Sequence, residues 1–188
     1  YLLQGLGLRP AQAGPLLMVV PLTRLVFSPI SGIMSDKFQS RTISTIGLMI
    51  MLMGYLVLVT LNIESSLEKI LIGLILTGSG SAIFLPPNNS VVMGSVTKDK
   101  LGMASAIIPM VRQVGISMGI ALIGTMYSIS ESASRSLFST QGLEGNELIK
   151  MATMVGYRDS LSVSLIFLVL AIIFSALRGK DNNKENIA

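Results

Sequence analysis

Two arginines lie inside long apolar runs, where a charged side chain is energetically unfavourable unless a specific interaction stabilises it. Arg24 is the one charged residue between positions 13 and 35, and Arg112 the one between 101 and 130. A cation at the centre of a membrane helix costs about 2.5–3.5 kcal/mol on insertion scales. Each arginine therefore either lines a polar cavity, contacting an acid or a substrate, or reaches the membrane surface or carbonyls freed by prolines. Arg112, followed by Gln113, favours the cavity; for Arg24 both readings stay open.

Other kinds of chemistry have no side chains to perform them. The sequence has no His and no Cys, which removes the commonest metal ligand, the commonest general base and every thiol. No Asp or Glu lies deep inside an apolar run, and arginine does not titrate. We therefore expect no enzyme, no metal site and no cofactor. If protons drive this protein, the coupling carboxylate lies on another part of it.

One apolar run carries amides and helix-breaking residues. Residues 70–97 contain Gly78-Ser79-Gly80-Ser81 and Pro86-Pro87-Asn88-Asn89, which predict a kinked or broken span. Irregular backbone survives in a bilayer only where protein shields it or where it lines a cavity. The two asparagines either line a substrate path or form hydrogen bonds between helices.

The elements that position these residues are membrane helices. The 188 residues are 51% hydrophobic and 13% charged, with a mean hydropathy of +0.70, whereas soluble domains carry roughly 25% charge. About 20 apolar residues cross a bilayer. The predicted fold is an all-α, multi-pass membrane helical bundle with a lipid bilayer around it and five spans, at residues 13–35, 42–61, 70–97, 101–128 and 160–177.

The connections predict the orientation in the cell membrane. Residues 129–159 are rich in charged and amide groups and are expected to form an extracytoplasmic loop. The turns at 36–41 and 98–100 and the tail 179–188 then share the other side. That side holds seven basic residues, whereas the opposite side holds five. Because basic residues favour the cytoplasmic side, we expect the side with seven to be cytoplasmic. The seven are Lys37, Arg41, Lys98, Lys100, Arg178, Lys180 and Lys184.

Three further features complete the expectations. Gly115-x-x-x-Gly119 is typical of close helix–helix packing in membranes. The net charge of +4 is spread over the loops rather than forming one stripe, so we expect no nucleic-acid binding. The sequence opens at Tyr1 without an initiator Met, and we expect it to be part of a longer polypeptide whose N-terminal helices are missing here.

A charged turn carries a family resemblance. Gly32-x-x-x-Asp36-Lys37-x-x-x-Arg41 resembles the cytoplasmic loop signature of the major facilitator superfamily, Gly-x-x-x-Asp-basic-x-Gly-basic-basic. Gln39 and Ser40 stand where that signature has glycine and a basic residue. The wider pattern resembles the last five helices of the fourteen-helix drug–proton antiporter branch; it comprises Tyr1-Leu2-Leu3-Gln4, Gly7, Ala13-Gly14, Pro21, Gly78-x-Gly80, Pro86, Gly102-x-Ala104-Ser105 and Arg112-x-x-Gly115-x-x-x-Gly119.

The resemblance implies transport by alternating access, with two bundles rocking about a central site. Gly32, Asp36, Lys37 and Arg41 would form a conformational latch, with Asp36 near a helix N-terminus that favours an anion. The implied activity is proton-coupled efflux of hydrophobic or cationic drugs or metabolites. The alternative from the residues alone is a non-transporting five-helix scaffold or assembly subunit.

Overall fold

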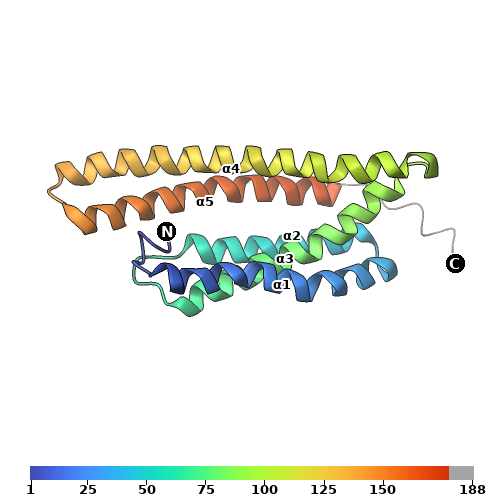
Figure 1. Cartoon of the computed structure of the whole chain (residues 1–188), viewed down its shortest axis with the longest axis horizontal. Helices are drawn as coiled ribbons and strands as arrows, with labels where there is room; N and C mark the ends of the chain where they lie inside the picture. The colour runs from blue at the N-terminus through green and yellow to red at the C-terminus, as the bar shows by residue number, and fades with distance from the viewer. Residues whose placement is uncertain (178–188) are drawn as a thin grey trace.

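Five long helices run back and forth along one axis (Figure 1). The computed structural model describes residues 1–177, apart from the side chains of Asp36 and Lys37; the predicted tail 179–188 lies outside that range. All five helices are long and apolar enough to cross a membrane, which confirms the predicted all-α membrane bundle. They are α1 (Pro10–Lys37), α2 (Ser40–Val59), α3 (Leu67–Gly94), α4 (Leu101–Thr140) and α5 (Gly145–Leu177), with a short 3-10 turn, η1 (Lys98–Lys100), before α4.

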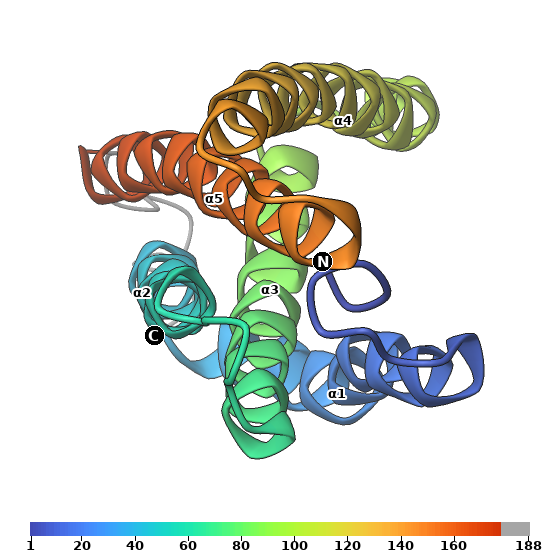
Figure 2. The same ribbon diagram turned by 90° about the vertical axis from the view of Figure 1, so that its left-hand side faces the viewer.

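The helices form two groups. Helices α4 and α5 pack as one antiparallel pair, and α3 packs between α1 and α2 as the centre of the other group. Figure 2 shows α3 crossing the middle of the molecule, with α1 and α4 bordering one side and α2 and α5 the other. The second group is joined to the first by α2 against α5 and by the C-terminal end of α3 near α4.

Prolines lie inside helices that continue through them. Helix α1 contains Pro15, Pro21 and Pro29, and α3 contains Pro86 and Pro87. Of the predicted kinked or broken third span, the break is therefore wrong, because α3 is one continuous helix. Proline lacks an N–H group, so the carbonyl four residues earlier loses its partner. For Pro87 that carbonyl belongs to Ile83, and the hydroxyl of buried Ser31 on α1 donates to it at 2.7 Å.

Glycines bring α2 and α3 into backbone contact. A Cβ built on Gly80 would lie 2.4 Å from the backbone nitrogen of Met51, and one on Gly54 would lie 2.6 Å from that of Thr77. Such distances exclude any side chain larger than hydrogen. Gly47 makes a similar approach to the backbone of Phe84, and Gly73 lies against the side chain of Leu58. Each helix therefore carries two contact glycines seven residues apart.

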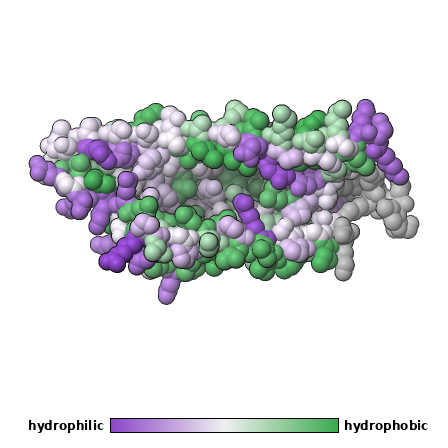
Figure 3. Space-filling model, in the orientation of Figure 1, coloured by the Kyte–Doolittle hydropathy of each residue, from purple (hydrophilic) through white to green (hydrophobic). Residues whose placement is uncertain are grey.

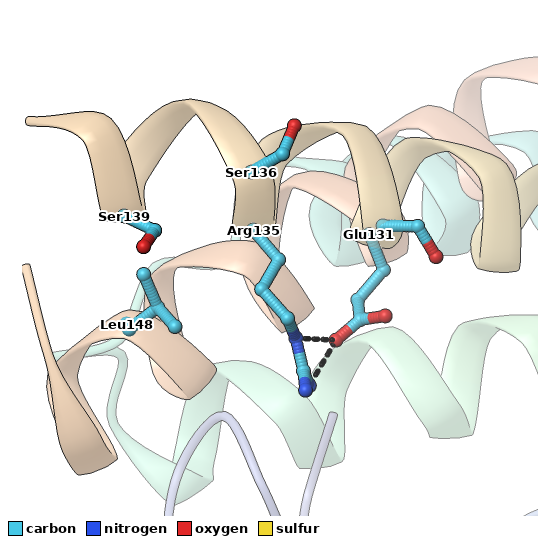
Figure 4. A pocket seen from close by; sticks show the side chains of 6 residues that line it. Glu131, Arg135, Ser136, Ser139 and Leu148 are labelled. Carbon is cyan, nitrogen blue, oxygen red and sulfur yellow. Dashed lines mark hydrogen bonds and ion pairs between the residues drawn. The ribbon is translucent and has the colours of Figure 1, made fainter.

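The predicted loop at 129–159 is mostly helix. Helix α4 runs to Thr140 and α5 begins at Gly145, so four residues connect them. The polar residues there stabilise helix rather than end it: Arg135 donates through Nε and Nη2 to Glu131 Oε1, at 3.1 and 2.5 Å, one turn away on α4. Figure 4 shows this pair beside Leu148 of α5. At about 1.5 Å per residue α4 is about 60 Å long, twice a bilayer's hydrocarbon core of about 30 Å.

Candidate functional site

The candidate site lies where α1, α3 and α4 border one hollow. Figure 3 shows the molecule hollowed between the α4–α5 pair and the group below it, with hydrophilic side chains among apolar ones. Helix α3 lies behind this opening, while α1 and α4 border it (Figures 1 and 2). Both arginines picked out from the sequence belong to the bordering helices.

Arg24 reaches from α1 to α3. Its Nε donates to Ser81 Oγ at 2.9 Å, and this serine is 6% exposed. Ser81 Oγ in turn donates to the carbonyl of Gly78 at 2.8 Å. A Cβ on Gly78 would lie 3.0 Å from Thr23 Cβ, so this glycine is what lets α1 approach α3. Arg24 therefore bonds a neutral side chain on another helix and not a carbonyl freed by proline.

Arg112 makes the corresponding contact from α4. Its Nη2 donates to Asn89 Oδ1 at 2.7 Å. Asn89 and Asn88 are half-buried on α3, whereas Arg112 and Gln113 are exposed on α4. The sequence left two possibilities for Asn89, a place on a substrate path or a hydrogen bond between helices. The structure shows such an interhelical hydrogen bond. The same bond leaves most of the guanidinium uncovered by the residues described.

Among the side chains that the structure describes, neither arginine has an acidic partner. Within the part of the chain that the structure describes, the one ion pair joins Arg135 to Glu131, far along α4 from Arg112. The same residues contain no group of three acidic side chains that could hold a metal ion. On the helices that border the hollow, the described hydrogen-bond partners of the two arginines are thus a hydroxyl and an amide oxygen.

The residues of the expected latch lie at the end of α1 and the start of α2. Asp36 and Lys37 occupy the last turn of α1, three residues before α2 begins. Arg41, in the first turn of α2, donates through Nη2 to the carbonyl of Ala176 in the last turn of α5, where the helix dipole favours a cation. Beside it, the hydroxyls of Thr45 and Ser175 are 3.0 Å apart. Sequence patterns gave no signal for this link to α5.

The glycines of α4 and α1 point to open space in this chain. Nothing lies within 4 Å of a Cβ built on Gly115 or Gly119, and the same holds for Gly32. The close packing predicted for Gly115 and Gly119 therefore has no partner among the described residues. Within residues 1–177 the tightest glycine contacts lie between α2 and α3, and looser ones lie at Gly78 against α1 and at Gly156 against α4.

An apolar cavity of about 660 Å³ lies near the start of α1 and the end of α2, at the opposite end of these helices from the α1–α2 turn. It is roofed by the first residues of the chain, where Tyr1 stacks on Tyr157 with ring centroids 4.2 Å apart. The Tyr1 hydroxyl donates to the carbonyl of Asn62 at 2.8 Å, and burial raises the pKa of this phenol. Neither Arg24 nor Arg112 lines this cavity.

Known proteins with similar sequences are named as transporters or as resistance proteins. The riboflavin transporter RibZ of Clostridioides difficile is 26% identical over 174 residues, covering 93% of this chain and 37% of the relative. The multidrug resistance protein Stp of Mycobacterium tuberculosis is 33% identical over 130 residues, covering 68% and 24%. The methyl viologen resistance protein SmvA of Salmonella typhimurium is 27% identical over 159 residues, covering 85% and 32%.

The family assignment rests on nearly the whole chain. The chain spans between a quarter and two fifths of the length of these curated relatives. Residues 1–181 match the family described as the Major Facilitator Superfamily. The chain therefore belongs to the major facilitator superfamily and is a multi-pass membrane protein.

Proposed function

We propose that this chain works as the C-terminal part of a transporter that exports hydrophobic or cationic drugs or metabolites by alternating access, coupled to protons. The observation that carries the proposal is the pair of arginine contacts, Arg24 to Ser81 and Arg112 to Asn89, around an opening between α1, α3 and α4. Polar groups at membrane depth mark substrate paths because they are costly anywhere else. The scaffold alternative gains no support from the relatives, which are named as transporters or resistance proteins.

The partners of this part are further helices of the same polypeptide. Helices α1 and α4 are mostly uncovered, and Gly115 and Gly119 on α4 face open space. These relatives are about two and a half to three times as long as this chain, so they have enough further residues to cover both helices. We place the coupling carboxylate there, because the apolar centres of the five spans contain no Asp or Glu.

The turn between α1 and α2 is the proposed conformational latch. The turn contains the residues that match the family signature, Gly32, Asp36, Lys37 and Arg41. The hydrogen bond from Arg41 to the last turn of α5 holds the turn against that helix. Basic residues follow both α1 and α3, namely Arg41 in the first turn of α2 and Lys98 and Lys100 in η1. They support a cytoplasmic position for these two connections. A cysteine at Gln39 should then react with an impermeant reagent only from the inside, and one at Gly142 only from the outside; the reverse pattern would overturn the orientation.

Transport itself is tested with the complete protein in liposomes. A hydrophobic fluorescent dye should move against its gradient when a pH difference is imposed, and a protonophore should abolish the movement. Dye flux equal to that of protein-free liposomes would contradict transport. Equal dye flux with and without the pH difference would contradict proton coupling but would still support transport.

A further inference from the structure

We propose that Arg41 is a positioning residue that fixes the last turn of α5 on α2, and that transport requires this link to stay closed. The role rests on the transport function proposed above. It also separates Arg41 from the other residues of the signature turn. Those residues remain in the proposed latch, whereas Arg41 acts within its own group of helices, through the end of α5.

Four residues of α2 and α5 form a chain of hydrogen bonds, which we call the α2–α5 link. The Arg41 side chain donates through Nη2 to the carbonyl of Ala176. The Thr45 hydroxyl donates to the backbone carbonyl of Arg41 at 2.9 Å and lies 3.0 Å from the hydroxyl of Ser175. Because a hydroxyl has a single proton to donate, Ser175 is the donor to Thr45. Arg41 therefore joins α5 twice, directly through its side chain and through Thr45 at its carbonyl.

The end of α5 is a favourable place for a cation. The last four carbonyls of an α-helix have no partner within the helix, and the aligned peptide dipoles give this end a partial negative charge. Helix α5 ends at Leu177, so Ala176 belongs to the last turn. Arg41 is half-buried there. It supplies both a positive charge and an N–H donor to a carbonyl of this turn.

The link lies at one end of the larger contact between the two groups of helices, that of α2 with α5. Within residues 1–177, the hydrogen bonds between α2 and α5 are confined to this end. Towards the other end, Tyr157 and Leu161 of α5 pack against an apolar cluster that includes Leu58 of α2. Apolar packing has no preferred direction, whereas a hydrogen bond requires a defined distance and angle. The link therefore sets the position of α5 along α2.

The surroundings of Arg41 differ from those of Gly32, the first residue of the signature. A Cβ built on Gly32 would have nothing within 4 Å among the described residues. That side of the turn is therefore open to further helices of the complete protein. Arg41 is already bonded to α5. The signature thus divides into a part open to other helices and a part bound within this chain.

A disulfide that replaces the α2–α5 link tests this role. In a cysteine-free background of the complete protein, Arg41→Gln should lower dye efflux by about 10-fold, because the charge-assisted hydrogen bond to α5 is lost. Adding Thr45→Cys with Ser175→Cys and oxidising the pair should restore about half of the efflux or more, because a disulfide holds two positions at a fixed separation. A reducing agent should abolish the recovery. Lys98→Gln, which removes a basic residue of η1, is the matched control and should leave efflux unchanged.

Two results of this experiment would overturn the role of Arg41. One is normal efflux by Arg41→Gln. The other is efflux that stays low after the cysteine pair is oxidised, since Arg41 would then act on another part of the protein. If Arg41→Gln fails to fold, Arg41→Lys takes its place, because lysine keeps the charge but lacks the planar fork of donors; its efflux should fall by about 3-fold and return on oxidation.

The rate of disulfide formation tests the link without any transport. When Arg41 is replaced by Gln, α5 should separate from α2 more often, so that the cysteine pair at positions 45 and 175 oxidises more slowly, by about 3-fold or more. Lys98→Gln should leave the oxidation rate unchanged. Equal rates with and without Arg41 would overturn its role. Slower oxidation in a protein whose unmodified form moves no dye would contradict the transport function alone.

Discussion

The hydroxyl of Ser31 on α1 donates to the carbonyl of Ile83 on α3 at 2.7 Å, and this carbonyl is the one that Pro87 leaves without an intrahelical partner. Ser31 is fully buried. A proline in a membrane helix is tolerated when a neighbouring helix satisfies the freed carbonyl. This bond therefore satisfies the carbonyl that Pro87 frees on α3 and joins α1 to α3 at that point.

Removing that bond should destabilise the bundle more when the proline is present than when it is absent. Ser31→Ala leaves a buried carbonyl unsatisfied, which costs about 1–3 kcal/mol. In a Pro87→Ala background the helix supplies its own N–H, so Ser31→Ala should cost less by about 1 kcal/mol or more. Thermal unfolding of the complete protein in detergent, run as a double-mutant cycle, gives the difference. Additive effects would show that Ser31 and Pro87 are not linked.

The α2–α3 contact should reject any side chain at its glycines. Gly80→Ala places a methyl group 2.4 Å from the backbone of Met51, and overpacking of this kind costs about 1–3 kcal/mol. We expect a lower unfolding temperature and poorer monodispersity on size-exclusion chromatography. Gly102→Ala, with nothing within 4 Å of the added methyl, is the control and should match the unmodified protein. A stable Gly80→Ala protein would mean that the two helices pack less closely than described.

Hydropathy predicted the five helices, but not the contacts that set their arrangement. An apolar run of about 20 residues is long enough to cross a bilayer. The number and order of the helices therefore followed from the apolar runs. Close packing at Gly115 and Gly119 remains a prediction, whereas the tightest contacts within residues 1–177 lie at Gly47, Gly54, Gly73 and Gly80. Their spacing of seven is visible only once α2 and α3 are known to be partners, which no single helix sequence reveals.

The ends of the helices and the partners of the arginines needed the three-dimensional structure. Polar residues after position 128 indicated a loop, but a helix can extend into water when pairs such as Glu131–Arg135 stabilise it. Arg24 and Arg112 could be chosen from their apolar surroundings alone. Their partners, Ser81 and Asn89, could not, because contacts 57 and 23 residues away along the chain depend on how the helices cross.

The contact of α2 with α5 can be tested by cross-linking. The hydroxyl oxygens of Thr45 and Ser175 are 3.0 Å apart. In a cysteine-free background, Thr45→Cys with Ser175→Cys should form a disulfide under mild oxidation, detected as a mobility shift after cleavage between the two positions. Thr45→Cys with Ser164→Cys, three turns away on α5, is the control and should not cross-link. Equal cross-linking of both pairs would indicate that α2 and α5 slide freely.

The proposed latch predicts a loss of function at Asp36. Asp36→Asn keeps the size of the side chain but removes its charge, so the signature turn loses its anion. We expect dye efflux by the complete protein to fall about 10-fold or more, with expression and unfolding temperature close to those of the unmodified protein. Gln39→Asn, in the same turn but outside the signature, is the control. Full efflux by Asp36→Asn would make the turn a plain connector.

The most direct measurement is the accessibility of Asn89 to water in the membrane-embedded, complete protein. Asn89→Cys and Phe174→Cys, each in a cysteine-free background, are exposed to a membrane-impermeant maleimide; Phe174 is 72% exposed on the apolar surface of α5. If α1, α3 and α4 enclose a solute path, the cysteine at position 89 should react at least about 10-fold faster, and a transported dye should slow that reaction. Equally slow labelling at both positions, unaffected by dye, would contradict a solute path between these helices.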